Sequence, residues 1–466
     1  MSFLLDDTQK AVADTVFSLH TNKKNVSAKI KSLPPKWQKH PVVMFARFEW
    51  RIRNNLRDSA LQVLENYSTS ATHLSQPSKW AFRREALARD LMFDEEYARA
   101  YEISSKHYLE TGDTYAVLEW LSGYLALEKL KNTELALKHF KNFLLSVDAP
   151  ISLGRGFYWL GRTYEQQGKM DTAKQIYQIG ADRWETYYGL LAAEKVGLTA
   201  DKTVLNTPNV SSWKEASFLT SSVFKAAKLL FSANQEVLAE RFLTHLTETL
   251  SDHDVLRLVN FLEESKKPHE LVMVAKRAAS QSRVFPRPYF AIHPLVEMPQ
   301  RIPPEMALAI ARRESEFYPK VESPVGALGM MQVMPKTARE VAKRLGLRYS
   351  SERMLSDWHY NARIGIAYLE ELSERYEGNP ILIAAAYNAG PSRADRWIEL
   401  LGDPRNPKVD LVNWVESIPF EETRNYVMRV AESLPNYAVR LNKKSPDSFY
   451  LYLKGSTFLP LTPKSE

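Results

Sequence analysis

The sequence contains no cysteine and little glycine. Of its 466 residues, none is cysteine and 17 are glycine. The lack of thiols excludes disulfide bonds, thiolate zinc sites and cysteine nucleophiles. Little glycine beside abundant Leu, Ala, Glu, Lys and Arg disfavours turn-dense sheet folds and favours helices. We therefore expect a mainly α protein.

Long hydrophobic runs are also missing. No stretch approaches the roughly 18 consecutive apolar residues of a membrane span. The start, MSFLLDDTQK, lacks the basic and apolar regions of a secretory signal. We expect no transmembrane segment, and the start fits a cytoplasmic protein or a mature form whose leader has been removed.

Neither charge sign dominates strongly, since 62 Lys and Arg oppose 55 Asp and Glu, for a net charge of +7. A mild basic excess suits nucleic acid, cell wall or a lipid surface as partner, or simply a soluble basic surface. No compact nucleic-acid-binding motif is present. Phosphate loops, serine elbows and metal-binding histidine pairs are absent too. We expect neither a nucleic-acid partner nor a metal.

Amphipathic helical patterns fill the chain from about residue 40 to 285. In one of them, Phe45, Phe48, Ile52, Leu56 and Ala60 recur at helical spacing. Such a series needs neighbouring elements to bury each apolar stripe, which predicts an α-solenoid.

The clearest repeat unit spans residues 157–181. It has the small and aromatic residues of a tetratricopeptide-type helical hairpin at Leu160, Gly161, Tyr164, Ala173 and Tyr177. A segment with Ala136 and Phe140 echoes it weakly. We therefore expect a loose α-α superhelix and not a regular repeat array.

Seven prolines between Pro268 and Pro304 mark a connector, because proline lacks a backbone donor and fixes its own φ. This predicts a domain boundary near residue 290. Shorter helices are then expected near residues 336–345, 360–376, 380–388 and 422–441, with a turn-rich insert at 319–335. We expect a peripheral tail at 446–466.

One carboxylate stands on an apolar helix face. A helix is predicted from Glu305 to Phe317, and Ala307, Ile310 and Ala311 share a stripe with Glu314. The neighbouring residues Arg312 and Arg313 are expected on other faces. Loss of solvation raises the pKa of a carboxyl, so that it can stay protonated and act as an acid. The alternative is a buried glutamate paired with an arginine.

A turn-rich segment, SPVGALGMMQVMP, follows this helix. Gly326 and Gly329 permit tight bends, and Met330, Met331 and Met334 offer an adaptable apolar wall. The amide of Gln332 can donate and accept hydrogen bonds, as an acetamido sugar requires. A methionine cluster can also be core filling.

Four ordered segments resemble the catalytic domain of the soluble lytic transglycosylases, which are goose-lysozyme-like. They are ARRES with Glu314, SPVGALGMMQVMP from Ser323, AAAYNAGP at 384–391 and ESIPFEETRNYV at 416–427. The resemblance implies a lysozyme-like α domain at 291–445 preceded by an α-superhelical domain at 1–290. Residues of about 200–290 could form a linker subdomain within the latter.

The resemblance also implies a reaction. The β-1,4 bond between N-acetylmuramic acid and N-acetylglucosamine would be cleaved without water, leaving a 1,6-anhydro end. Glu314 would act first as acid and then as base, without a cofactor. The positions that match family cleft residues or lie in the motifs are expected to bind substrate, namely Ser323, Gln332, Met334, Tyr387, Asn388, Glu416, Glu422 and Tyr426.

Alternatives stay open. A hydrolytic muramidase would need a second carboxylate, for which Asp357 and Glu370 are candidates. A non-catalytic helical-repeat scaffold that binds peptidoglycan would explain the solenoid. The family reading implies a periplasmic protein, with peptidoglycan strands as partner and cell-wall synthesis or secretion-machinery proteins as further candidates.

Overall fold

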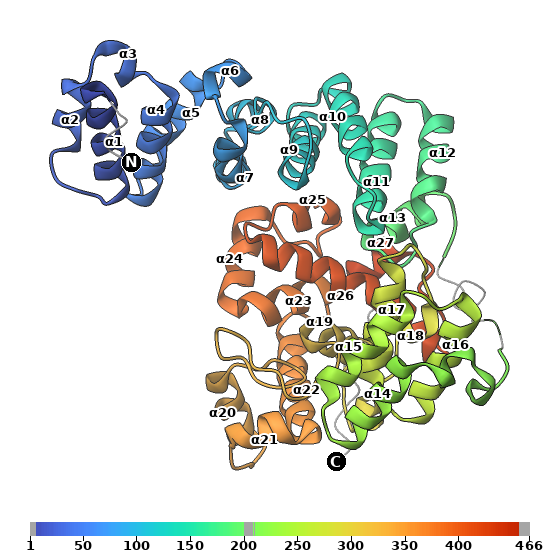
Figure 1. Ribbon diagram of the computed structural model, residues 1–466. Helices are drawn as coiled ribbons and strands as arrows, with labels where there is room; N and C mark the ends of the chain where they lie inside the picture. The colour runs from blue at the N-terminus through green and yellow to red at the C-terminus, as the bar shows by residue number, and fades with distance from the viewer. Residues whose placement is uncertain (1–5, 200–207, 209, 456–466) are drawn as a thin grey trace. The chain divides into compact units, whose positions relative to one another are not determined.

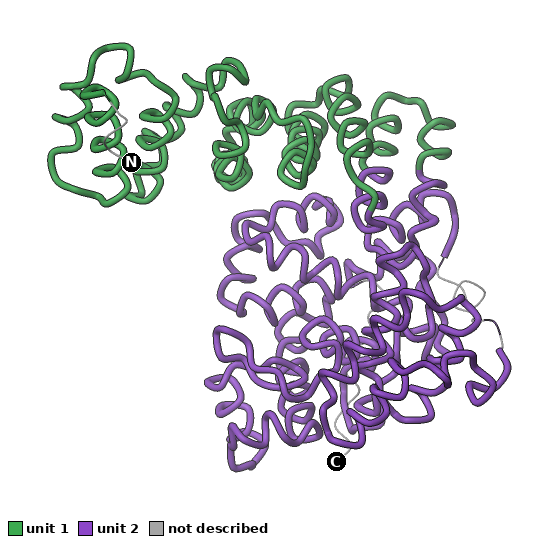
Figure 2. The backbone as a smooth tube through the Cα atoms, viewed as in Figure 1, with its two compact units in different colours: residues 1–148, 159–176 green, residues 149–158, 177–466 purple. Residues whose placement is uncertain are grey.

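The computed structural model describes residues 6–199, 208 and 210–455. These residues are helical apart from turns, loops and two isolated β-bridges, which pair Glu322 with Leu328 and Leu328 with Val333. The prediction of a mainly α protein with a small turn-rich insert is confirmed. Two compact units make up the chain, residues 1–148 with 159–176 and residues 149–158 with 177–466 (Figure 2).

The first unit is a succession of helices. Its elements are α1 (Asp7–His20), α2 (Val26–Ser32), α3 (Pro35–Gln38), α4 (Pro41–Arg53), α5 (Arg57–Tyr67), α6 (Ala71–Leu74), α7 (Pro77–Phe93), α8 (Tyr97–Ser105), α9 (Asp113–Tyr124), the π-helical turn Leu125–Lys129 and α10 (Thr133–Leu145). Helices that follow one another pack together, as α4 with α5, α7 with α8 and α9 with α10 (Figure 1). This local packing agrees with the solenoid pattern read from the sequence.

Small residues allow close helix contacts in this unit. A Cβ atom on Gly123 of α9 would lie 2.7 Å from the Phe140 ring of α10. Ala136 and Phe140 are both fully buried. The segment with Ala136 and Phe140, which resembles the repeat unit weakly in sequence, is therefore one helix of a closely packed pair, α9 and α10.

Residues 157–181 fold as the predicted helical hairpin, formed by α11 (Pro150–Gln166) and α12 (Met170–Ala181). A Cβ atom on Gly180 would lie 3.2 Å from Cβ of Phe157. The rings of Tyr158 and Tyr177 have centroids 5.9 Å apart. Glycine thus sets the helix separation here and the aromatic rings fill the groove between the helices.

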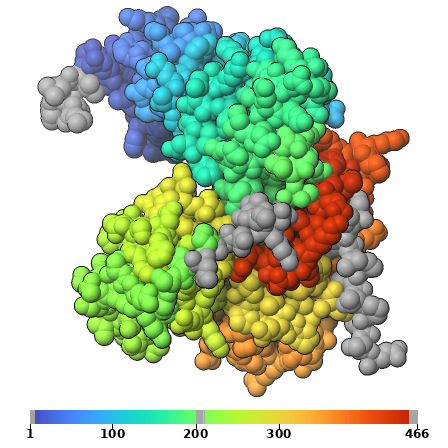
Figure 3. Space-filling view, turned by 90° about the vertical axis from the view of Figure 1, so that its right-hand side faces the viewer, coloured from blue at the N-terminus to red at the C-terminus, as the bar shows by residue number. Residues whose placement is uncertain are grey.

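The second unit contains the other helices. They are α13 (Tyr187–Lys195), α14 (Ser222–Ser232), α15 (Glu236–Thr247), α16 (Asp252–Glu264), α17 (Pro268–Ala279), α18 (Pro286–Tyr289), α19 (Pro304–Ser315), α20 (Pro335–Arg344), α21 (Ser351–Ser356), α22 (Trp358–Arg375), α23 (Pro380–Ala389), α24 (Pro391–Leu401), α25 (Leu411–Glu416), α26 (Glu421–Arg440) and α27 (Phe449–Leu453). Figure 3 shows the yellow-green residues of this unit on one side and its red C-terminal residues on another. The helix α26 packs against both α19, which carries Glu314, and α23, which carries Tyr387.

The prolines of the connector begin helices. Pro268, Pro286 and Pro304 each occupy the first helical position of α17, α18 and α19, where a missing N–H costs nothing. The second unit holds residues on both sides of position 290. Separate domains at 1–290 and 291–445 stay a prediction.

The end of the chain differs from the expected peripheral tail. Residues Phe449–Leu453 form α27, and Leu453 is fully buried. The Leu453 carbonyl accepts a hydrogen bond of 3.1 Å from Nδ2 of Asn379. The apolar FYLYL stretch supplies the reason, because its Phe and Leu side chains gain by leaving water. Residues 456–466 lie outside the described residues.

Candidate active site

The helix α19 carries Glu314 in its last turn. The apolar residues Ala307, Ile310 and Ala311 are fully buried, and Glu314 is partly buried. The helix ends at Ser315, two residues before the predicted end, because Glu316 and Phe317 have φ values of 46° and 67°. Left-handed backbone at two successive residues cannot continue a right-handed helix.

The carboxyl of Glu314 has one close hydrogen-bond donor. The hydroxyl of Tyr426 donates to Oε1 of Glu314 at 2.7 Å. Burial raises the pKa of Glu314 to about 7, although the Tyr426 hydrogen bond and the Arg313 charge both lower it; the charge of Glu422 raises it further. Glu314 is thus poised to hold a proton near neutral pH.

The alternative of a glutamate paired with an arginine is wrong for Glu314. Within the described residues, no Lys, Arg or His nitrogen comes within 4.0 Å of its carboxylate. Arg312 lies on another face as expected, with its Nε 3.0 Å from the Tyr289 carbonyl. Arg313 differs from the expectation, since its guanidinium lies 5.6 Å from the ring centroid of Tyr426. Its long side chain reaches the site although its Cα is on a different helix face.

Two tyrosines lie beside Glu314. Burial, followed by the charge of Glu314, raises the pKa of both Tyr387 and Tyr426 well above the ordinary value. Both phenols therefore stay protonated and can act as donors. The Tyr387 hydroxyl donates to the Met331 carbonyl at 2.6 Å, which joins α23 to the methionine-rich insert.

The insert is held by a buried amide that the sequence reasoning did not single out. Asn361 of α22 is fully buried, and its Oδ1 accepts from the Met331 N–H at 2.8 Å. Its Nδ2 donates to the carbonyls of Leu328 and Met354 at 2.9 and 3.1 Å. The sequence did not predict that Asn361 holds the insert, because most of its hydrogen-bond partners lie about 30 residues away along the chain.

Three predicted substrate-binding residues belong to the insert. The Ser323 hydroxyl accepts from the Ala327 N–H at 2.9 Å and closes a turn. Gln332, with φ of 46°, donates from its amide to the carbonyls of Val321 and Gly329 at 3.0 and 2.7 Å. Met334 is 44% exposed and precedes α20. Ser323 and Gln332 therefore shape the insert, while Met334 presents an apolar surface to solvent.

The end of α23 and the start of α26 meet through two more predicted residues. The Thr423 hydroxyl donates to Oδ1 of Asn388 at 2.6 Å. The Asn388 amide lies 3.5 Å from Oε1 of Glu422, which is exposed. The structure thus brings Asn388 and Glu422 together. Glu422 and Tyr426 lie on the same face of α26, and Tyr426 contacts Glu314 from this face.

Glu416, expected to bind substrate, lies in the interior. Its side chain is fully buried, and Nη2 of Arg155 donates to its two oxygens at 2.6 and 2.7 Å. The Tyr188 hydroxyl also donates to it. Neither partner was singled out from the sequence, since each lies more than 200 residues away along the chain.

The two candidate second carboxylates have structural partners. Asp357 caps α22, accepting from the Tyr360 N–H at 3.1 Å, and the hydrogen bond from Arg353 lowers its pKa. Oε1 of Glu370 accepts from the Arg301 N–H at 2.7 Å. Among the described residues, neither carboxylate contacts Glu314.

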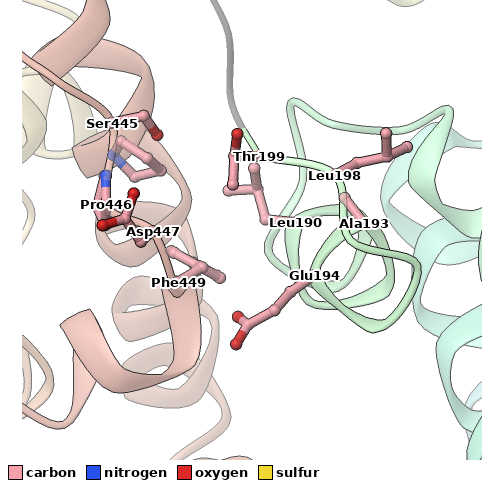
Figure 4. A pocket seen from close by; sticks show the side chains of 10 residues that line it. Leu190, Ala193, Glu194, Leu198, Thr199, Ser445, Pro446, Asp447 and Phe449 are labelled. Carbon is pink, nitrogen blue, oxygen red and sulfur yellow. The ribbon is translucent and has the colours of Figure 1, made fainter.

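In the part of the chain that the structure describes, no group of three or more His, Asp or Glu side chains could hold a metal ion. No helix there is both long enough and apolar enough to cross a membrane. A small pocket lies between the end of α13 and the segment before α27 (Figure 4). Glu194, a partly buried acid that lines it, already accepts from the Ser448 hydroxyl and the Tyr450 N–H at 2.6 and 2.8 Å.

The chain is similar to known murein-cleaving proteins. Residues 297–407 match the transglycosylase SLT domain. The chain is 32% identical over 279 residues to the soluble lytic murein transglycosylase of Escherichia coli K12, covering 59% of this chain and 42% of that protein. It is 31% identical over 289 residues to a putative soluble lytic murein transglycosylase of Haemophilus influenzae, covering 61% and 47%. The chain thus spans less than half the length of these relatives.

Solved structures show the same fold. An inactive mutant of the lytic transglycosylase Slt from Pseudomonas aeruginosa aligns over 95% of this chain and 74% of its own, with a TM-score of 0.65 and 20% identity. The soluble lytic transglycosylase of Escherichia coli aligns over the same shares, with a TM-score of 0.57 and 21% identity. The chain is therefore similar to the soluble lytic murein transglycosylases, and its C-terminal part carries the transglycosylase SLT domain.

Proposed function

We propose that this protein is a lytic transglycosylase of peptidoglycan. It would cleave the β-1,4 bond between N-acetylmuramic acid and N-acetylglucosamine and leave a 1,6-anhydro end. One observation carries the proposal: Glu314 is partly buried, has a pKa of about 7 and receives a hydrogen bond from Tyr426. A carboxylic acid of this kind can protonate a leaving glycosidic oxygen near neutral pH.

The reaction needs one protein carboxyl. Glu314 gives its proton to the glycosidic oxygen as the bond to C1 of the muramic acid breaks, and the 2-acetamido oxygen of the same sugar stabilises C1. The C6 hydroxyl then attacks C1 and returns a proton to Glu314. Both steps gain from proximity, because the attacking groups belong to the sugar that reacts. No water is consumed.

The surrounding residues supply binding and shape. Tyr387 and Tyr426 are protonated phenols beside the acid. Asn388, Glu422 and the exposed Met334 offer polar and apolar contacts to the glycan. Ser323 and Gln332 hold the turns of the insert in shape, and both stay partly exposed, so that they can contact the glycan. These roles follow from the resemblance and from the contacts and exposure of the side chains.

Peptidoglycan glycan strands are the proposed partner, which implies work in the periplasm. Proteins of cell-wall synthesis or of secretion machinery are proposed as further partners, because these proteins act at the cell wall. The mild positive charge of +7 favours association with the acidic groups of the wall.

Analysis of the products tests the activity. Purified protein incubated with peptidoglycan should release anhydro-muropeptides, which mass spectrometry separates from hydrolysis products because the two differ by one water. Hydrated reducing ends alone would identify a lysozyme-type hydrolase. Binding to peptidoglycan without any cleavage would instead favour a non-catalytic helical-repeat scaffold.

A further inference from the structure

The buried carboxylate of Glu416 joins three helices of the second unit. It is the last residue of α25, while its donors Arg155 and Tyr188 come from α11 and α13. Burial, followed by the charge of Glu416, raises the pKa of Tyr188 well above the ordinary value, so its hydroxyl stays a donor. The side chain of Glu416 has no exposed surface through which it could touch a sugar.

Stability alone does not account for this cluster. A buried ion pair loses about as much by desolvation as it gains by attraction, and apolar replacements of the same volume are often equally stable. What a bidentate guanidinium–carboxylate pair supplies is a defined geometry. Such a pair at Glu416 therefore acts on the position of the end of α25.

The end of α25 leads directly into the helix that contacts the acid. After Glu416, the chain reaches Phe420, the N-cap of α26. Nη1 of Arg424 donates to the Ile418 carbonyl at 2.7 Å and fixes this link to the first turn of α26. Tyr426, in the next turn, donates to Glu314.

The helix α13 is also bound to α26 further along. The Tyr187 N–H donates to Oε2 of Glu432 at 2.8 Å, and Glu432 is almost fully buried. The first turn of α13 therefore contacts a carboxylate of α25 through Tyr188 and one of α26 through Tyr187. A helix that holds both can set the angle between α25 and α26.

We propose that Glu416 is a positioning residue: held by Arg155 and Tyr188, it places the start of α26 so that Tyr426 meets Glu314. This inference rests on the proposed function and deepens it. It assigns to the helices α11 and α13 a part in the alignment of Glu314, and it removes Glu416 from the residues that contact substrate.

Two variants test the proposal, Glu416→Gln and the milder Tyr188→Phe. Each should lower kcat on glycan fragments about ten-fold, since a displacement of about 1 Å at a reacting group can cost about 100-fold. KM should stay within about two-fold of wild type, because neither side chain reaches substrate. The alkaline limb of the kcat–pH profile should move to higher pH, in the same direction as for Tyr426→Phe.

Tyr187→Phe is the matched control. Tyr187 is the neighbouring, equally buried tyrosine, and within the described residues its hydroxyl has no hydrogen-bond partner. It should leave kcat, KM and the pH profile unchanged. Circular dichroism and thermal melting check that every variant is folded.

Two results would overturn the positioning role in an active wild-type enzyme. Folded Tyr188→Phe with unchanged kcat and unchanged pH profile would make the cluster merely structural. A raised KM at constant kcat in Glu416→Gln would return Glu416 to the substrate-binding residues. Absence of cleavage by the wild type would instead refute the proposed function, and it is measured first.

Discussion

The hydroxyl of Tyr426 donates a hydrogen bond of 2.7 Å to Oε1 of Glu314, across 112 residues of chain. This contact opposes the effect of burial on the acid. Burial disfavours the ionised carboxylate, whereas a donor stabilises it. The balance leaves the pKa of Glu314 at about 7, where a proton can be both given and taken back.

Glu314→Gln should lower kcat by about 100- to 10,000-fold, the range for loss of a general acid or base. Binding to glycan strands should persist, because the amide keeps the shape of the side chain. Turnover assays and pull-down with insoluble peptidoglycan measure the two effects.

The matched control is Glu316→Gln, two residues along the chain. Its carboxylate pairs with Lys276 and makes no contact with Tyr426 among the described residues. Activity of this variant should stay near wild type. Equal loss in both variants would count against Glu314 as the acid.

The rate should depend on pH through the protonated form of Glu314. Because the acid must carry its proton in the first step, kcat should fall as pH rises through about 7. Initial rates on a soluble glycan fragment, measured at several substrate concentrations between pH 4 and pH 9, give kcat at each pH. A constant rate across pH 6 to 8 would contradict this assignment of the acid.

Tyr426→Phe should move that alkaline limb to higher pH. The phenol hydrogen bond lowers the pKa of Glu314, so its loss raises the pKa. Tyr437→Phe is the control on the same helix, since Tyr437 is fully buried and its hydroxyl has no partner among the described residues. A shift to lower pH in Tyr426→Phe would show that the tyrosine acts in another way.

The stability of the wild type should fall relative to Glu314→Gln as pH rises. The pKa of Glu314 is near 4.5 when unfolded and about 7 when folded. Between these values the unfolded chain loses its proton while the folded chain keeps it, so ionisation favours unfolding. Urea unfolding at pH 4 and pH 8 should show a variant advantage only at the higher pH, and an advantage that is the same at both would oppose the raised pKa.

Gly329→Ala should disrupt the insert. Gly329 has φ of 73°, and an added Cβ would lie 2.1 Å from the Met354 carbonyl oxygen. Gly326→Ala is the control, since Gly326 has φ of 85° but open space around it. We expect about 1 kcal/mol of lost stability for Gly326→Ala and clearly more for Gly329→Ala. Denaturant unfolding compares them, and equal losses would show that backbone strain alone matters.

The sequence determined the helical fold and the position of the acid on its helix. Helical periodicity depends on residues three and four apart, so the stripe with Ala307, Ile310 and Glu314 can be read locally. The same holds for helices such as α22 and α26. The predicted end of this helix, Phe317, lies two residues beyond the observed end at Ser315. Left-handed backbone is usually predicted from a glycine, and neither Glu316 nor Phe317 is one.

Only the tertiary structure decided the partners of these residues. It placed Tyr426 on Glu314, Arg313 over the Tyr426 ring, and Glu416 between Arg155 and Tyr188. Desolvation and hydrogen bonding, which set the pKa of a carboxyl, come from elements that are distant in the chain. Residue type and spacing do not encode such contacts, and the physical distinction between an acid and a positioning carboxylate therefore appears only in the folded protein.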